Sequence, residues 1–359
     1  MLNPTRTATG PRLLDRLDEI DVDWLTAALH AGGHADAEVA SFIATPVGNG
    51  NVSDTVRIDI RYEAPTAAPA SVVCKFRSTA EAAHAHGISS GSYFRETGSY
   101  RLIGRACRTP ALLWLDGGHD NINLVMEDLT GVARAGDQIA GCGPADARAV
   151  VVELAKLHRA FFPMTAEQAP DWAMTMAAAA DYWSRAIDRA LPVIREHVAS
   201  RLNDADMALI ERAAGLAHAW YSLPMARGTL THGDPRVDNI LFIDGEGEGS
   251  VQAVLIDWQL TGWRNPMHDV GYFLSGSVSV ADRRAHERDL LARYVEVFGP
   301  GYSLDTVTAD YRVQLLSGLM TTTACYGLIP LTPAFDALLI ALLERNLAAA
   351  ADWESLDAI

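Results

Sequence analysis

The pattern of apolar and polar positions divides the chain into a front part rich in strands and a back part rich in helices. Residues 56–62 alternate between apolar and polar with a period of two, as a half-buried strand does. From residue 145 onward, alanine- and leucine-rich segments repeat with helical spacing instead. This change of period predicts two lobes joined near residues 127–130.

The front part is predicted to begin with a short amphipathic helix that ends at Gly32–Gly33 and to continue mainly in strands. The predicted strands cover residues 38–47, 56–62, 71–76, 111–116 and 121–127, with one helix at 91–105. In the back part, helices are predicted at 145–162, 173–200, 204–223 and across 282–352, around a short β-region at 230–258. We therefore expect an α+β fold with an N-lobe (1–126), a hinge (127–130) and a mainly helical C-lobe (131–359).

A catalytic-loop motif is the strongest chemical signal. His232, Asp234 and Asn239 form the pattern H-x-D-x-x-x-x-N, followed directly by an apolar strand. Kinase loops use this spacing because the Asp orients a substrate hydroxyl and accepts its proton, while the Asn amide oxygen ligates Mg²⁺. An Asx-rich turn before a strand would give the same letters, so the surrounding sequence must decide.

A second acidic residue follows at the place where a kinase needs one. The segment 244–250 is a glycine-rich turn, and the apolar run that follows it ends at Asp257. This predicts a β-hairpin whose second strand leads to an aspartate that can hold Mg²⁺ against the phosphates. Asp234, Asn239 and Asp257 in this order favour a phosphotransferase over an ordinary strand-end turn.

The front part contains candidates for binding the nucleotide. Lys75 ends the predicted strand 71–76 and resembles the phosphate-binding lysine of the V-A-I-K strand, with Glu96 on the next helix as its ion-pair partner. Alternatively, Lys75 is a surface lysine and Glu96 lies on a solvated helix face. A predicted phosphate-covering loop, or a plain hairpin turn, comprises Gly48, Asn49, Gly50, Asn51 and Ser53.

These motifs together resemble the aminoglycoside phosphotransferase superfamily, and most closely its ecdysteroid-kinase-like and choline-kinase-like branch. The resemblance rests on HGDPRVDNILF (232–242), VLIDWQLTGWRNPMHDVGYFL (254–274), LAKLHR (154–159) and GNGNVSDT (48–55). It covers roughly residues 45–275, and it implies a bilobal protein-kinase-like fold.

The resemblance also implies roles for individual residues. Asp234 is expected to be the catalytic base, Asn239 and Asp257 to hold Mg²⁺, and Lys75 with Glu96 to bind the phosphates of ATP. The hinge residues expected to receive adenine through their backbone are Glu127, Asp128 and Leu129. His232 and Asp269 are expected to shape and brace the catalytic loop.

The chain departs from protein kinases in two ways. Asp257 begins Asp-Trp-Gln in place of Asp-Phe-Gly, and no A-P-E motif follows, which disfavours a protein kinase.

Arg236 lies two residues after Asp234, where we hypothesise that it stabilises the transferring phosphoryl group. A surface ion pair with Asp238 or another acid is an equal alternative for Arg236.

The composition and the net charge limit which binding partners and which cellular location we expect. The net charge of −16 disfavours nucleic acid, and no apolar stretch approaches the roughly 20 residues that span a bilayer. Four scattered cysteines and no apolar leader indicate a cytoplasmic protein. We expect a monomer or a homodimer, and the sequence does not distinguish between them.

We therefore predict an ATP- and Mg²⁺-dependent kinase of a hydroxyl-bearing small molecule. The alternative from another class is a catalytically silent nucleotide-binding scaffold, which would have been free to lose Lys75, Asp234, Asn239 or Asp257. A hydrolase has no supporting motif, because neither G-x-S-x-G nor HExxH occurs. Candidates for the acceptor pocket are aromatic, methionine and acidic residues of the back part: Trp172, Met174, Met176, Asp181, Tyr182, Trp183, Asp188, Trp258 and Trp263.

Overall fold

A five-stranded antiparallel sheet is the centre of the first of two structural units in the computed structural model. The structure describes residues 10–48, 52–225, 227–247 and 249–359. The first unit contains the described residues up to Gly104 with Thr109–Val132 and Asp257–Gln259, and the second contains Arg105–Arg108, Ala133–Ile256 and Leu260–Ile359.

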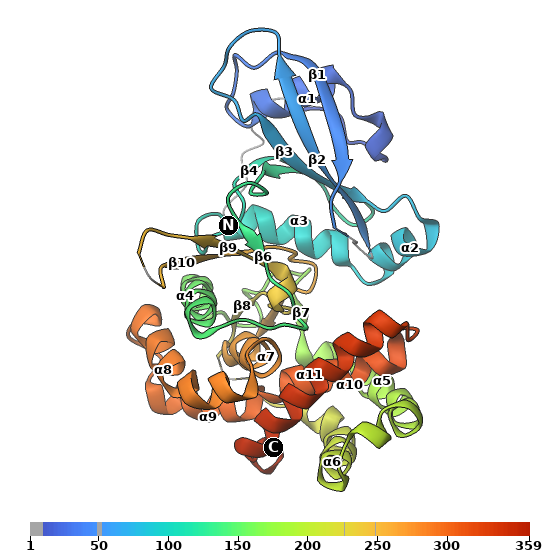
Figure 1. Cartoon of the computed structure of the whole chain (residues 1–359), viewed down its shortest axis with the longest axis vertical. Helices are drawn as coiled ribbons and strands as arrows, with labels where there is room; N and C mark the ends of the chain where they lie inside the picture. The colour runs from blue at the N-terminus through green and yellow to red at the C-terminus, as the bar shows by residue number, and fades with distance from the viewer. Residues whose placement is uncertain (1–9, 49–51, 226, 248) are drawn as a thin grey trace. The chain divides into compact units, whose positions relative to one another are not determined.

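The strand order in this sheet is β1-β2-β3-β5-β4, so that β3 is its central strand (Figure 1). Its strands are β1 (Val39–Pro46), β2 (Ser53–Tyr62), β3 (Ser71–Arg77), β4 (Leu112–Gly117) and β5 (Ile122–Glu127). In β3, Lys75 pairs with Thr55 of β2 and with Leu124 of β5. The strands on both sides therefore fix the position of the lysine backbone.

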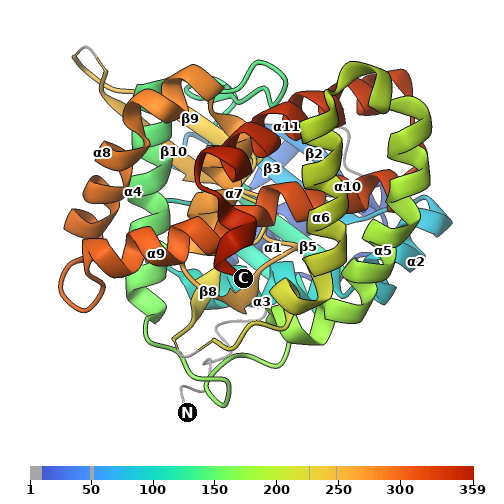
Figure 2. The ribbon, with the colours of Figure 1, turned by 90° about the horizontal axis from the view of Figure 1, so that it is seen from below.

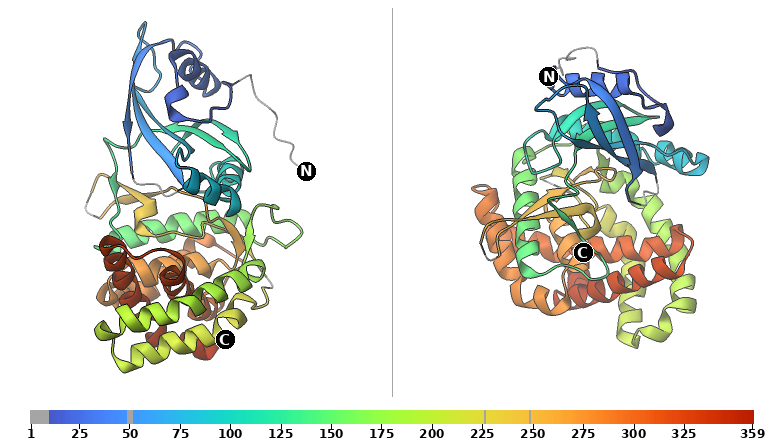
Figure 3. Two further views of the ribbon diagram at one scale, coloured as in Figure 1. Left: turned by 90° about the vertical axis from the view of Figure 1, so that its right-hand side faces the viewer. Right: turned by 45° about the horizontal axis from the view of Figure 1, so that its top comes forward.

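Helix α1 (Val22–Ala31) covers an apolar face of the sheet, as the left view of Figure 3 shows. Asp21 caps the helix by accepting a hydrogen bond from the backbone N–H of Trp24. Trp24 then packs with Cys74 and Phe76 of β3 in one buried cluster. Because successive strand residues face opposite ways, Lys75 points away from this cluster.

The second unit is mainly helical. Figure 2 shows its helices, of which α5 packs against α6 and α10. The helices are α4 (Pro144–Phe161), α5 (Met176–His197), α6 (Asp204–Tyr221), α7 (Met267–Ser277), α8 (Val280–Phe298), α9 (Leu304–Gln314), α10 (Leu316–Leu328) and α11 (Pro333–Asp352). The apolar faces of α5, α6, α10 and α11 meet in a core that includes Ile187, Trp220 and Leu319.

Two small sheets carry the segments between these helices. One has the order β10-β9-β6 and the other β7-β11-β8. Their bounds are β6 (Arg134–Ala135), β7 (Met174–Thr175), β8 (Thr229–Thr231), β9 (Ile240–Asp244), β10 (Val251–Leu255) and β11 (Gly262–Arg264). Strands β9 and β10 form the antiparallel hairpin expected around residues 244–250, with Leu255 opposite Ile240.

The α+β fold class predicted from the sequence is confirmed, but two helices of the structure were not predicted. These are α2 (Glu81–Ser89) in the first unit and α7 in the second, and the first unit also contains α3 (Ser92–Ile103) near its predicted position. Helix α2 has hardly any apolar face, and α7 is buried at all of its positions, so neither shows the one-sided pattern of a surface helix. Within the described residues, no helix is both long enough and apolar enough to cross a membrane.

Candidate active site

Lys75 lies between two carboxylates of the first unit. Its Nζ donates to Glu96 Oε1 of α3 at 2.7 Å and to Asp257 Oδ1 at 3.1 Å. The side chain of Lys75 is 13% exposed and that of Glu96 only 2%. Burial lowers the pKa of Lys75, but the charges of Asp257 and Glu96 outweigh it, so its pKa is raised above the ordinary value. The lysine is therefore a fixed positive charge.

Asp257 has an unusual backbone conformation. It lies just after β10 with φ at 64°, one of two non-glycine residues with positive φ among those described. Side chains other than glycine rarely adopt this region, and residues held there often belong to functional sites. Its Oδ1 faces Lys75, and its Oδ2 accepts from Gln259 Nε2 at 3.2 Å.

The catalytic-loop motif of the second unit brings Asp234 and Asn239 together. Strand β8 leads into the loop, and a short 3₁₀ turn at Val237–Asn239 leads out of it into β9. Asn239 Nδ2 donates to the backbone oxygen of Asp234 at 2.9 Å and to its Oδ2 at 3.1 Å. Both side chains are buried, and the asparagine orients the carboxylate.

Arg236 contacts the same carboxylate. Its Nε donates to Asp234 Oδ1 at 3.1 Å, while its Nη1 lies 3.7 Å from Asp238 Oδ2. The charge of Asp234 is the first cause of a raised pKa for Arg236. The sequence left a pair with Asp238 open, and in the structure Asp234 is the nearer partner.

Asp269 of α7 braces the loop from behind. Its Oδ2 accepts the backbone N–H of His232 at 2.6 Å, and its Oδ1 accepts that of Gly233 at 2.9 Å. His158 Nε2 of α4 lies 3.1 Å from Oδ2. Burial alone would raise the pKa of Asp269, but the hydrogen bond with His158 and the nearby His268, 3.7 Å away, hold it well below its ordinary value. The buried carboxylate therefore stays charged.

The loop also depends on His232 and Gly233. His232 Nε2 lies 2.9 Å from the backbone oxygen of Ile256, and its Nδ1 accepts the backbone N–H of Asp234 at 3.3 Å. Gly233 has φ at 87°, and a Cβ there would lie 2.0 Å from the backbone oxygen of Leu260. Only glycine fits at this position.

The family model of the ecdysteroid kinase-like family matches residues 48–300, which include every residue of both clusters. This match spans more than half of the chain. The chain belongs to the ecdysteroid kinase-like family. No curated protein matches the sequence.

Solved structures that resemble this family member include small-molecule kinases. The GDP complex of aminoglycoside 2'-phosphotransferase-IIIa shares 13% identity at a TM-score of 0.53, over 89% of this chain and 96% of that one. A choline/ethanolamine kinase family protein from Mesorhizobium loti shares 16% identity at a TM-score of 0.49, over 88% and 91%. At this identity the first likeness shows the fold alone, which is protein-kinase-like as predicted.

Only some of the predicted nucleotide-loop and hinge residues lie within the described part of this ecdysteroid kinase-like protein. Asn49, Gly50 and Asn51 lie outside the described residues, whereas Gly48 precedes them with φ at 73° and Ser53 begins β2. In the predicted hinge, Glu127 ends β5 and Leu129 is buried.

Asp128 has a contact set that the sequence did not suggest. Its carboxylate accepts from Arg57 Nε at 2.6 Å, from Ser71 Oγ at 2.6 Å and from the backbone of Thr130 at 2.9 Å. Burial alone would raise the pKa of Asp128, but these donors lower it to about 2. Its side chain therefore ties the end of β5 to β2 and β3.

Sequence reasoning missed Tyr272. It lies on α7, three residues after Asp269, and so on the same side of that helix. Burial and the nearby charge of Asp234 raise the pKa of its phenol well above the ordinary value. The helical spacing from Asp269 was the available signal, but α7 was not predicted as a helix.

Six of the nine acceptor candidates fall into three groups, and the other three line neither cavity described below: Trp172 is half-buried, and Asp181 and Asp188 are exposed. Met174, Met176 and Trp183 line a cavity of about 30 Å³ that also borders Gly233. Trp258 is fully buried and Tyr182 is 50% exposed. Trp263 and Met176 line a larger neighbouring cavity of about 550 Å³, which shares Thr175 and Met176 with the first.

Proposed function

We propose that this protein phosphorylates a hydroxyl group of a small molecule with Mg-ATP. The observation that carries the proposal is Lys75, buried and charged between Glu96 at 2.7 Å and Asp257 at 3.1 Å. A lysine fixed in this way on a central strand can pair with nucleotide phosphates, and Glu96 sets its orientation. Membership of the ecdysteroid kinase-like family supports the same conclusion.

Asn239 and Asp257 have the oxygen donors that Mg²⁺ requires. Both hydrogen bonds of Asn239 to Asp234 use its amide nitrogen, which leaves the amide oxygen for a cation. Among the described residues, no group of three His, Cys, Asp or Glu side chains could hold a metal alone. Mg²⁺ commonly binds through one or two protein oxygens completed by phosphates and water, and it would neutralise charge on those phosphates.

Asp234 is the proposed catalytic base. An alcohol is a weak nucleophile, so a carboxylate that accepts its proton as the bond to phosphorus forms lowers the barrier. Asn239 and Arg236 hold the two oxygens of Asp234, and Asp269 fixes the backbone before it. Asp234 can therefore orient an acceptor hydroxyl without first reorganising.

Arg236 is proposed to stabilise charge on the transferring phosphoryl group. Its raised pKa keeps it cationic, and its contact with Asp234 holds the guanidinium beside the base. Arg236→Lys keeps the charge but loses the planar fork. We expect Arg236→Ala to lower kcat at saturating ATP by 10-fold or more, on the order of other transition-state donors. Unchanged turnover would remove Arg236 from the mechanism.

The remaining nucleotide contacts are proposed from the positions of the hinge and loop residues in the chain. The backbone at Glu127–Leu129 would receive adenine, and Gly48, Ser53 and the residues between them would cover the phosphates. Asp128 is committed to Arg57 and Ser71, so adenine would be read through backbone groups only. The acceptor would be a hydroxyl-bearing small molecule, and the protein a cytoplasmic monomer or homodimer that binds neither nucleic acid nor membrane.

Two variants separate the base from the nucleotide site. We expect Asp234→Asn to abolish transfer while the affinity for Mg-ATP, measured by calorimetry, stays within a few-fold of wild type. Asp257→Ala should instead weaken Mg-ATP binding, because a metal oxygen and a partner of Lys75 are both lost. Wild-type affinity for Mg-ATP in Asp257→Ala would reject the metal role of Asp257.

A further inference from the structure

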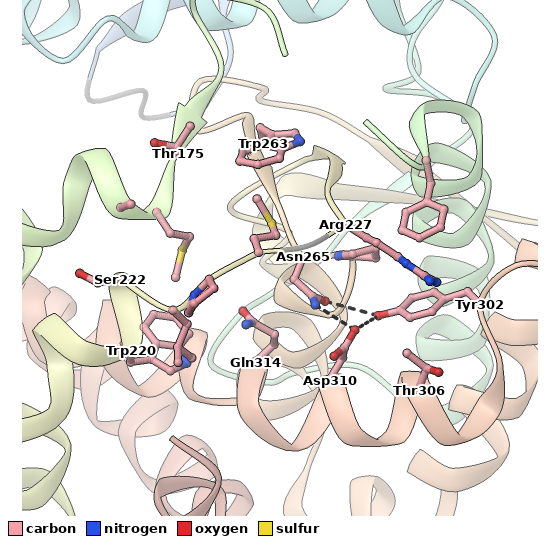
Figure 4. A pocket seen from close by; sticks show the side chains of 17 residues that line it. Thr175, Trp220, Ser222, Arg227, Trp263, Asn265, Tyr302, Thr306, Asp310 and Gln314 are labelled. Carbon is pink, nitrogen blue, oxygen red and sulfur yellow. Dashed lines mark hydrogen bonds between the residues drawn. The ribbon is translucent and has the colours of Figure 1, made fainter. Parts of the chain in front are cut away.

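A large cavity of the second unit lies apart from the catalytic loop. Its volume is about 550 Å³, within the range of small-molecule sites, and residues from α5, α6, α9 and the segments flanking β8 and β11 line it (Figure 4). The cavity borders Arg227, before β8, and Asn265, after β11. The catalytic loop begins at the other end of β8. None of the described residues that line this cavity belongs to the catalytic loop (232–239), although the cavity shares Thr175 and Met176 with the small cavity that borders Gly233.

The polar side of this cavity is built around Asp310 of α9. One oxygen of Asp310 accepts from Asn265 Nδ2 at 2.9 Å and from Tyr302 Oη at 2.5 Å, and Figure 4 shows these bonds as dashed lines. Both donors are neutral. Within the part of the chain that the structure describes, Asp310 forms no ion pair. Its negative charge is thus available to a cation.

The aromatic side of the cavity is fixed in place. The indole N–H of Trp220 donates to the backbone oxygen of Val313 at 3.0 Å, and that of Trp263 donates to the backbone oxygen of Met164 at 2.8 Å. Trp220 is only 1% exposed and belongs to the helix core, so it forms the floor of the cavity, whereas the half-buried Trp263, with its N–H occupied, offers an apolar ring surface to a ligand. Aromatic faces near a carboxylate attract organic cations, since the ring quadrupole is negative above the plane.

Among the described residues that line the cavity, Arg227 is the one basic side chain, and it would favour an anion. It lines the same cavity and is exposed, without an ion-pair partner among the described residues. An exposed guanidinium is well solvated, so its effect on a ligand is weak compared with that of the half-buried Asp310. The net charge of −16 further favours cations near the molecule.

We propose that this cavity binds a small organic cation, an ammonium group on an apolar or aromatic body. The ammonium pairs with Asp310, and the apolar body packs on Trp263. The site is separate from the proposed phosphotransferase site and does not depend on that function.

Calorimetric titration with three probes of one shape tests the proposal. These are 2-phenylethylammonium, the neutral 2-phenylethanol and the anionic 3-phenylpropanoate. We expect the ammonium to bind at least 10-fold more tightly than the alcohol, as a charge-assisted contact requires. Equal or weaker binding of the ammonium would overturn the proposal.

Variants then locate the bound probe. Asp310→Asn keeps the shape and the acceptor for Tyr302, and should weaken ammonium binding about 10-fold or more. Asp305→Asn, on the same helix but away from the cavity, is the matched control and should change nothing. Arg227→Gln should leave binding of the ammonium unchanged or tighten it, and weaker binding would contradict a cation site.

Two more variants test whether the ammonium probe binds in this cavity rather than at the catalytic loop. Ser222 is exposed and lines the cavity, so Ser222→Trp should block it without disturbing the core. Loss of ammonium binding in Ser222→Trp, with an unchanged melting temperature, supports the site. Asp234→Asn should bind the ammonium like wild type. Loss of binding in that variant would assign the probe to the catalytic loop and overturn the proposal.

Discussion

At the scale of single residues, Lys75 shows how burial and charge are balanced. Glu96 is buried with it, so removing the glutamate leaves a desolvated lysine with Asp257 alone. We expect Glu96→Ala to lower the free energy of unfolding by about 3–5 kcal/mol, the usual cost of breaking a buried pair. Urea denaturation measures this loss.

A double variant separates stability from function in the same pair. Replacing both charges, in Lys75→Met with Glu96→Leu, should recover most of the lost stability, because both members of the buried pair are gone and the remaining Asp257 is 28% exposed and keeps its bond from Gln259. Binding of Mg-ATP should still be lost, since the phosphates lose their cation. Nucleotide affinity equal to wild type in this variant would exclude Lys75 as a phosphate ligand.

His268 gives the protein a pH dependence of stability. Burial lowers the pKa of His268 from 6.5 to about 4. Between these values the unfolded state binds a proton that the folded state does not, so stability falls as pH decreases from 6.5 to 4, by about 1.4 kcal/mol per pH unit. His268→Gln should flatten this slope, with the exposed His218→Gln as control. An unchanged slope in His268→Gln would mean that other groups cause it.

Contacts of single residues were only partly predictable. The pairing of Lys75 with Glu96 could be predicted because Lys75 lies on the V-A-I-K-like strand and Glu96 on the helix that follows it. The hydrogen bond from Arg57 to Asp128 joins residues 71 positions apart, and no local sequence pattern predicts it. For Arg236, the sequence offered several nearby acids, and only the geometry shows that Asp234 is the nearer partner.

At the scale of elements, the catalytic loop is held by a glycine and a buried carboxylate. A methyl group at Gly233 would meet the backbone oxygen of Leu260 at 2.0 Å, and φ at 87° adds strain. We expect Gly233→Ala to abolish transfer and to destabilise the protein by more than the roughly 1–2 kcal/mol of left-handed strain alone. Gly249→Ala is the matched control, because it has φ at 73° but open space around it. Equal effects of the two variants in thermal unfolding and turnover would contradict this packing constraint.

The elements that carry the motifs were predicted better than those that support them. Strand β2 follows from period-two alternation, and the β9–β10 hairpin follows from two apolar runs around a glycine-rich turn. Helix α7 carries the bracing Asp269 but is buried at every position, so its sequence has no polar face to reveal a helical period. The brace was thus expected from resemblance, and its helix was not.

At the scale of the whole molecule, the acidic composition sets the expected partners. A net charge of −16 opposes binding to polyanions, whose phosphates or sulfates need a basic surface. We expect the protein to pass through a heparin column even at low salt. Retention that salt reverses would indicate a basic surface and a nucleic-acid or membrane partner instead.

The central claim is transfer of a phosphoryl group from ATP to a small-molecule hydroxyl. Mass spectrometry of the protein incubated with Mg-ATP and a panel of sugars, aminoglycosides, amino alcohols, macrolides and sterols tests it most directly, with Asp234→Asn as the blank. We predict a phosphorylated acceptor that forms with wild type and is absent from the blank. The same product in Asp234→Asn, or no binding of Mg-ATP by wild type at all, would contradict the account.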